Sequence, residues 1–446
     1  MHVLIIGAGT GGLCLAQALR TAGVSVAVYE RDRTRNDGLF GYRVGISPDG
    51  SRALHACLPE RLFDTFVATT AITPNWFSMY TEQYGELLSL GGFDTAAADD
   101  PGAERSVSRM TLRQVLLTGI EDIVSFDKKF TRYEQHADGT VTAHFADGTS
   151  ATGDVLVGAD GTGSPVRRQY LPHATLQETD LFGITAKLPL TEQTRALLPP
   201  KVLRGVSMVT APGGDGMIIH VMEFPWDADG VKQGIGGNDA DLLRAWPGLN
   251  FDNTRDYIML GFSSHRRRLP ADFMSLDGPA LHAIMLDRTQ RWHPDLRALV
   301  AGSDPSTCFP LNIRTTDRVP PWASSTVTLI GDAIHTMTPG LGVGANTALR
   351  DARILAEGLI AAERGERTVL DAVGAYEQQM HGYAWDLVAK SLERFDADAA
   401  IYRSGIGGRL ALAGMRTGMR LVNHLPPLKR KMAAATSADR GHDRLE

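Results

Sequence analysis

The chain has 446 residues, enough for two or three domains with a sizeable core. Its 45 Lys and Arg against 51 Asp and Glu give a formal charge of −6 without long blocks of one sign, which argues electrostatically against nucleic acid and anionic membranes as partners. The three cysteines are widely spaced and odd in number, so a disulfide framework or a zinc site is not expected, and a reducing cytoplasm is favoured.

The first 30 residues predict a dinucleotide-binding unit. An apolar strand leads into the glycine turn Gly7–Gly12, a helix follows, and a second strand ends at Glu30. Gly9 allows the backbone to approach a pyrophosphate, Gly12 allows the helix to pack closely on the strand, and the helix N-terminus faces the phosphates. Glu30 can accept hydrogen bonds from a ribose diol and would repel a 2′-phosphate. Taken alone, the segment fits FAD and NAD equally well.

Short elements and turns fill the chain up to about residue 172. We expect two strands within Trp76–Leu90, a helix over Thr111–Ile120, and strands at Thr140–Phe145 and Asp154–Val157. Asp-Gly pairs at 138–139 and 147–148 are strong hairpin signals. A small antiparallel layer is therefore predicted here.

The next region changes to longer alternating strands, of which Met217–Phe224 is the clearest. Helices are expected near Asp239–Trp246 and Leu281–Arg291. A buried strand, Thr326–Ile330, then enters another glycine-rich turn, and a helix begins near Thr347. This pattern predicts a second domain followed by a return to the first.

Helical patterns dominate the C-terminal region. The stretch Ile406–Met432 mixes basic and apolar residues, and it has two interpretations: a helix at a membrane surface, or a terminal helix packed on the cofactor domain with its basic face in water. We favour the second, because Pro426 and Pro427 interrupt the pattern.

Two further motifs identify a family. Asp160-Gly161 follows a predicted strand, and Gly331-Asp332 opens the second glycine-rich turn. Together with the first motif, these motifs resemble those of the single-component FAD-dependent aromatic hydroxylases, and the resemblance extends over roughly residues 1–360. This family includes p-hydroxybenzoate and salicylate hydroxylases and the tetracycline-modifying monooxygenases. The resemblance implies that the first unit holds the ADP half of FAD, and that NADH or NADPH visits as a co-substrate elsewhere.

The resemblance also assigns a cofactor site. It implies that Asp160 and Gly161 serve both the FAD diphosphate and the approach of the nicotinamide. It also implies that Asp332 accepts a hydrogen bond from the flavin ribityl chain, and that the second glycine-rich turn lies beneath the isoalloxazine. A helix N-terminus at that place would stabilise negative charge on reduced flavin. His335 is expected to be a hydrogen-bonded structural residue. The expected cofactor-binding residues are Gly7, Gly9, Thr10, Gly11, Gly12, Glu30, Arg31, Arg43, Arg109, Asp160, Gly161, Gly331, Asp332, Pro339, Gly342, Gly344, Ala345 and Asn346.

The reaction implied by the resemblance is a hydroxylation. NAD(P)H would reduce FAD, and a flavin C4a-hydroperoxide formed with O2 would transfer one oxygen to an aromatic or polyketide-like molecule in a closed apolar pocket. Alternation places Ile218, His220, Met222 and Phe224 on one strand face, and His220 is a candidate base for a phenol, with ordinary core packing as the competing interpretation. Two alternatives use the same scaffold: a non-redox cyclase that retains FAD, and a flavin-dependent reductase.

We predict an α/β fold: a Rossmann-like FAD-binding domain with an inserted mixed β-sheet substrate domain and C-terminal helices. A monomer or homodimer without a metal site and without stable membrane insertion is expected. The predicted divisions are a discontinuous FAD-binding domain at 1–72, 100–172 and 310–370, a substrate-binding domain at 73–99 and 173–309, a helical region at 371–435, and a disordered tail at 436–446.

Overall fold

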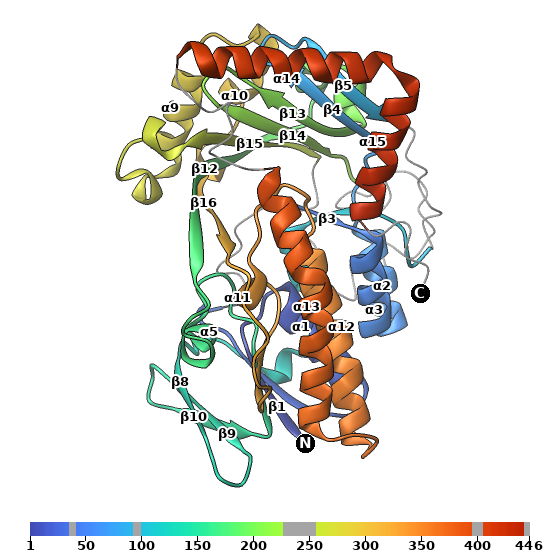
Figure 1. Ribbon diagram of the computed structural model, residues 1–446, viewed down its shortest axis with the longest axis vertical. Coiled ribbons are helices and arrows are strands. Elements are labelled where there is room, and N and C mark those ends of the chain that lie inside the picture. The colour runs from blue at the N-terminus through green and yellow to red at the C-terminus, as the bar shows by residue number, and fades with distance from the viewer. Residues whose placement is uncertain (35–41, 92–99, 226–255, 395–404, 441–446) are drawn as a thin grey trace.

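Two stacked parts, joined by two long strands, make up the computed structural model of this chain (Figure 1). The joining strands are β12 (Leu176–Pro189) and β16 (Phe309–Thr316), which pair antiparallel. The predicted α/β class is confirmed. The structure describes residues 1–34, 42–91, 100–225, 256–394 and 405–440.

The lower part contains a five-stranded parallel sheet in the order β17-β11-β1-β2-β7. Its central strands are short apolar runs, typical of a parallel sheet covered by helices. Because parallel strands end at the same edge, the turns after β1, β11 and β17 lie together there. The strands are β1 (His2–Ile6), β2 (Ser25–Tyr29), β7 (Val124–Ser125), β11 (Val155–Gly158) and β17 (Val327–Leu329), and the main helices of this part are α1 (Thr10–Thr21), α12 (Gly344–Glu363) and α13 (Val369–Glu393).

Smaller elements complete the lower part. The predicted antiparallel layer is confirmed in part: Thr140–Phe145 contains β9 of a three-stranded sheet of β8, β9 and β10, with the Asp-Gly pairs in its turns. Asp154–Val157, which was predicted in the same layer, belongs to β11 and pairs parallel with β1, because it is a buried apolar run of the central sheet. A separate antiparallel pair, β3 and β6, lies between the two parts. These elements are β3 (Arg43–Ile46), β6 (Arg105–Ser108), β8 (Phe130–Gln135), β9 (Val141–Phe145), β10 (Ser150–Gly153), α2 (Pro48–Cys57), α3 (Glu60–Ala68), α4 (Arg109–Leu117), α5 (Pro165–Tyr170) and α11 (Asp332–His335).

The upper part is built on a seven-stranded mixed sheet in the order β16-β12-β15-β14-β13-β4-β5. Strand alternation gives it two apolar faces: Met217 and Ile219 pack in one core with α9 and α10, whereas Ile218 points to the opposite face. The remaining elements are β4 (Trp76–Thr81), β5 (Glu86–Gly91), β13 (Gly205–Thr210), β14 (Gly216–Met222), β15 (Tyr257–His265), α6 (Glu192–Ala196), α7 (Pro200–Leu203), α9 (Gly278–Arg288) and α10 (Pro294–Ala301).

The C-terminal helices differ from the sequence expectation. α14 (Ile406–His424) lies across the upper sheet and not on the cofactor domain, because Met419 and Val422 pack on the cluster formed by β4 and β5. α15 (Pro426–Asp439) begins at the two prolines, which separate the helices as expected, and continues through the first part of the predicted disordered tail. The side chain of Arg440 then bonds the backbone oxygen of Leu341 at 3.0 Å.

Most other predicted elements are confirmed. The Trp76–Leu90 segment forms β4 and β5, Leu281–Arg291 corresponds to α9, and Thr326–Ile330 contains β17. The predicted helix at Asp239–Trp246 lies outside the described residues. Among the described helices, none combines the length and the apolar composition needed to cross a membrane.

Candidate functional site

A cavity of about 600 Å³ lies between the parallel sheet's strand ends and the lower face of the seven-stranded sheet. The first motif, the Asp-Gly motif and the second glycine-rich turn all reach it, although they are more than 100 residues apart in the chain. The predicted residues that line it are Gly9, Thr10, Gly11, Gly12, Arg43, Arg109, Gly161, Gly331, Asp332, Pro339, Gly342, Gly344 and Ala345.

The glycine turn after β1 has the geometry of a cofactor cradle. Gly7 has φ +110°, a conformation that favours glycine, and a Cβ on Gly12 would lie 2.2 Å from the Gly7 carbonyl oxygen. A Cβ on Gly9, in contrast, would meet no atom within 4 Å, because Gly9 faces the cavity. Open space at Gly9 beside the N-terminus of α1 fits a diphosphate group.

Glu30 lies behind this turn and does not line the cavity. Its carboxylate is 7% exposed and accepts hydrogen bonds from the backbone N–H of Ala8 at 2.6 Å and of Asp32 at 3.0 Å. Arg113, which the sequence analysis did not assign, donates to the Ala8 oxygen at 3.2 Å and to the Asp32 carboxylate at 3.0 Å. Arg31 is exposed outside the cavity lining. Arg113 lies four positions after Arg109 in an otherwise apolar helix, and this pattern in the sequence could have pointed to it.

Asp160 has one carboxylate oxygen with a protein partner and one without. Oδ2 accepts from the N–H of Val166 at 3.2 Å, whereas the buried Oδ1 has no hydrogen-bond partner among the described residues. Burial raises the pKa of this carboxyl, although hydrogen bonds from Ser164 and Val166 oppose the shift. Asp160 itself is not among the residues that line the cavity, although its neighbour Ala159 is. Gly161 follows with φ +77° and lines the cavity.

Asp332 points into the cavity from the start of α11. The preceding Gly331 has φ +61° and ψ −142°, so the turn requires glycine. The Asp332 side chain is open to the cavity, but the surrounding protein keeps it away from bulk water, and this desolvation raises the pKa of its carboxyl. The negative charge of Asp351 raises this pKa further, whereas His335 and Arg109 lower it. A ribityl hydroxyl donating to this carboxylate would relieve its desolvation.

A buried network fixes the turn that carries Asp332. Asp351, on α12, accepts from the Gly331 N–H at 2.7 Å and from Tyr383 at 2.5 Å, and it lies 2.6 Å from Nε2 of His335. Burial lowers the pKa of His335, but the charge and hydrogen bond of Asp351 outweigh this effect and raise it. His335 is fully buried, and this arrangement agrees with the structural role expected for it. The sequence analysis did not find Asp351.

The second glycine-rich turn is tied to β3 by Asn346. Its amide donates to the Gly45 oxygen at 2.9 Å and accepts from the Ser47 N–H at 2.8 Å, so its side chain does not line the cavity. The N-terminus of α12, which begins at Gly344, faces the cavity instead. This is a site where a helix N-terminus would stabilise negative charge on a bound ring.

Arg43 and His220 share one hydrogen-bonding partner, Ser106. The Nε of Arg43 donates to its hydroxyl at 3.0 Å, and Nε2 of His220 lies 3.1 Å from the same oxygen. Burial, followed by the charge of nearby Arg440, lowers the pKa of Arg43 to about 10. His220 is 1% exposed, and burial and the charge of Arg43 hold its pKa well below the usual value. It does not line the cavity, which favours the packing interpretation.

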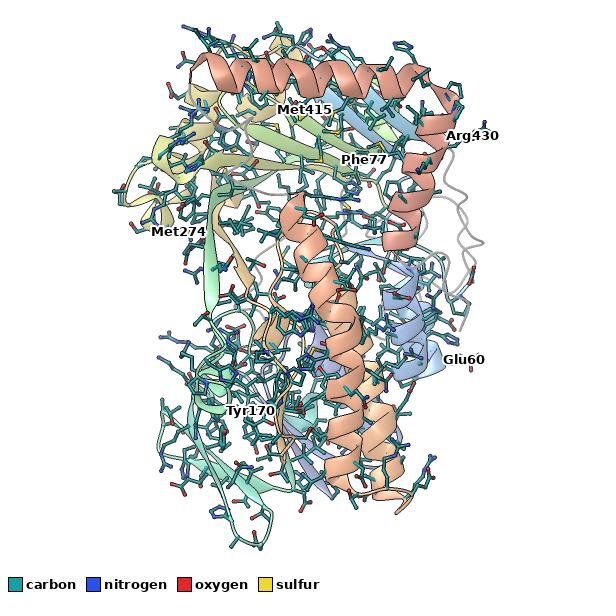
Figure 2. All side chains as sticks on the ribbon, viewed as in Figure 1. Glu60, Phe77, Tyr170, Met274, Met415 and Arg430 are labelled. Carbon is teal, nitrogen blue, oxygen red and sulfur yellow. The ribbon has the colours of Figure 1, made fainter. Side chains whose placement is uncertain are left out.

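The opposite wall of the cavity is apolar and comes from four strands of the upper sheet. Figure 2 labels Phe77, which lies on this wall. Only Ile218 among these residues was predicted from the sequence; Trp76 and Phe77 reach the wall through the pairing of β4 with β13, which no local pattern shows. The apolar lining residues of this wall are Pro74, Trp76, Phe77, Val206, Met208, Ile218 and Met259.

Two arginines and a glutamate add charge at this wall's margin. Arg440 donates to Glu104 at 2.6 Å, and both residues, together with Arg394, line the cavity. The site therefore combines a glycine-rich polar wall that fits a dinucleotide with an apolar wall that fits a flat organic ring.

Comparison with known proteins is consistent with this geometry. Residues 1–39 and 290–391 match a family model described as an FAD binding domain. A Photorhabdus luminescens protein, whose crystal structure is described as that of an FAD containing monooxygenase, shares 33% identity, covers 89% of this chain and 98% of its own, and superposes with a TM-score of 0.75.

Curated relatives are similar over different shares of their length. A dual O-methyltransferase/FAD-dependent monooxygenase of Cercospora beticola is 33% identical over 91% of this chain but only 46% of that protein. The chain thus spans about half the length of the first curated relatives that it matches. An FAD-dependent urate hydroxylase of Klebsiella oxytoca is 27% identical over 89% of this chain and 90% of that protein.

Proposed function

The chain belongs to the FAD-dependent monooxygenases, and on this premise we propose that it uses NADH or NADPH and O2 to hydroxylate an aromatic or polyketide-like small molecule. The observation that carries the proposal is one cavity with a cofactor wall and an apolar wall. Urate, the substrate that names one relative, is a planar ring, which supports a planar substrate here.

On the cofactor wall, each group has a binding role. The N–H groups at the start of α1 would hold the diphosphate, Arg109 would add positive charge beside it, and Asp332 would accept a ribityl hydroxyl. The N-terminus of α12 would stabilise negative charge on the ring. When bound, FAD supplies electron transfer from the nicotinamide and activation of O2.

On the apolar wall, the protein positions the substrate and excludes water. Trp76 and Phe77 offer aromatic surfaces, and Met208 and Met259 are flexible, polarizable side chains that adapt to a planar ring. A dry cavity favours oxygen transfer to the substrate over loss of the oxidant to water. The base role of His220 stays a prediction; the geometry supports it only through Ser106.

The test begins with the purified protein and FAD. We expect a yellow protein whose absorbance near ~450 nm bleaches when NADH or NADPH is added without O2, faster in the presence of a substrate. A panel of phenols and polyketide-like rings, screened by flavin fluorescence, should contain a ligand that increases both nicotinamide oxidation and O2 consumption. An FAD-loaded protein that neither nicotinamide reduces, with any ligand, would favour the cyclase alternative. Reduction without O2-dependent product would favour the reductase.

The nicotinamide preference, a cytoplasmic location, and a monomeric or homodimeric state are further proposals. Cys14, Cys57 and Cys308 are buried free thiols, which supports a reducing compartment.

A further inference from the structure

The segment that forms α14 and α15 carries an unusual concentration of exposed apolar side chains. Five of the eleven large hydrophobic residues found exposed in the described structure lie in these two helices, and a sixth, Leu425, lies between them. Exposed apolar residues on an ordinary surface are scattered singly, so this concentration needs an explanation. The six residues are Ile406 (76% exposed), Leu410 (68%), Leu421 (59%), Leu425 (39%), Leu428 (46%) and Met432 (41%). We call these six residues the outer apolar face.

α14 is therefore apolar on two sides. Its inner side packs on the upper sheet through Met419 and Val422, and Figure 2 shows Met415 on the side toward the strands. On the opposite side, Leu410, Thr417 and Leu421 follow at helical spacing, with alanine and glycine between them. A surface helix normally turns only a polar side to water, whereas α14 exposes these leucines beside its arginines. Packing on the upper sheet explains the apolar residues on the inner side of α14, but no contact in the described part of the fold explains those on its outer side.

The charge of this segment is equally one-sided. Residues 406–438 contain six Lys and Arg and no Asp or Glu, so the rest of the chain carries −12 against −6 for the whole. Arg416 is used internally, since it pairs with Glu82. Within the described part of the chain, Arg409, Arg420, Arg430 and Lys431 form no ion pair, and Figure 2 places Arg430 at the outer edge of α15. These cations are available to an anionic partner.

We propose that the outer apolar face and its flanking cations bind the surface of an anionic lipid bilayer, with α14 lying in the plane of the interface. Leucine and methionine side chains would enter the acyl boundary while arginine and lysine contact the headgroups. A second copy of the chain fits less well, because it would bring two cationic surfaces together. Nucleic acid also fits less well, because residues 406–438 contain no aromatic side chain for base stacking. The overall charge of −6 does not reveal this local basic segment. The proposed binding is to the membrane surface and needs no helix that spans the membrane.

Vesicle flotation tests the proposal on the FAD-loaded protein. We expect binding to vesicles of equal phosphatidylcholine and phosphatidylglycerol, at least ~10-fold stronger than to phosphatidylcholine alone, and weakened by salt. Leu410→Ser combined with Leu421→Ser should reduce binding at least ~10-fold. Arg430→Gln and Lys431→Gln should each reduce it about fivefold, the factor equivalent to ~1 kcal/mol for each charge.

A matched control replaces two exposed leucines elsewhere. Leu286 and Leu370 are 38% and 51% exposed on α9 and α13, and their serine variants should bind vesicles like the unaltered protein. Retained ~450 nm absorbance in every variant shows that the fold and FAD site are intact. No binding to anionic vesicles, equal binding to neutral vesicles, or equal loss in the control pair overturns the proposal. A dimer that Leu410→Ser and Leu421→Ser dissociate, without vesicle binding, also overturns it and assigns the face to a second copy.

Discussion

Replacing Gly9 by alanine separates FAD binding from folding. Gly9 has φ −83° and ψ −176°, an extended conformation that alanine adopts, and its Cβ would meet no atom within 4 Å. Gly9 precedes α1 as its N-cap, so the loss of stability is limited to the N-cap preference, about 0.5–1 kcal/mol. The added methyl would occupy the space where a diphosphate approaches the backbone. Loss of one hydrogen bond to a charged group costs about 1.5–3 kcal/mol, which is a ~10- to 150-fold rise in the FAD Kd.

Titration of apoprotein with FAD, followed by fluorescence quenching, measures this Kd, and thermal unfolding of the apoprotein measures stability. Gly12→Ala provides the contrast: its Cβ would lie 2.2 Å from the Gly7 oxygen, so it should destabilise the fold itself. Gly382→Ala, on α13 with open space around its Cβ, should leave the Kd unchanged. A Gly9→Ala protein that binds FAD as tightly as the unaltered protein would refute the placement of the diphosphate at this turn.

Three further predictions follow from the site. The raised pKa of Asp332 should fall when a hydroxyl of FAD donates to its carboxylate, so FAD affinity should increase as the pH rises through that raised pKa. Asp332→Asn should abolish this pH dependence of the FAD Kd. A pH profile that Asp332→Asn leaves unchanged would contradict the assignment. Arg113→Ala should lower the free energy of unfolding by ~2 kcal/mol, because it breaks the partly buried ion pair with Asp32. Arg20→Ala breaks the ion pair with Asp122, whose side chains are exposed by half or more, and should lower it by less than ~1 kcal/mol. Equal losses in denaturant unfolding would argue against the role of Arg113 behind the glycine turn. His220→Ala should leave the coupling of nicotinamide oxidation to product unchanged; uncoupled turnover in a stable, FAD-loaded variant would restore the base role.

The parts of the site that the sequence predicted are those with short-range physical requirements. Gly7, Gly161 and Gly331 all have positive φ, and each follows an apolar strand, so the pattern of strand, glycine and helix shows in a few consecutive residues. The parallel strands then bring the three turns to one edge of the sheet. The family resemblance added what local pattern could not, namely that the three turns serve one cofactor.

The parts that the sequence did not predict depend on contacts across the fold. Asp351 accepts from Gly331 across 20 residues, and Arg113 donates to Ala8 across 105 residues. A charged residue in an apolar helix is visible in the sequence, but its distant partner is not. Glu30 follows β2 as expected, but its carboxylate is engaged by backbone N–H groups, which only the packed turn reveals. The apolar wall was missed in part because β4 pairs with β13, more than 100 residues later in the chain, and this pairing shows only in the folded sheet. The C-terminal helix was assigned to the wrong part because its inner apolar side matches either sheet.

Oxygen-isotope labelling shows whether this protein transfers an oxygen atom from O2 to its substrate. The FAD-loaded protein is supplied with ¹⁸O2, the nicotinamide that reduces it, and the ring compound that most stimulates nicotinamide oxidation, and the product is analysed by mass spectrometry. We expect a hydroxylated product heavier by the ~2 mass units of one ¹⁸O atom, with no label incorporated from H2¹⁸O. A product that forms without O2, or that takes its oxygen from water, would contradict the assignment as a monooxygenase.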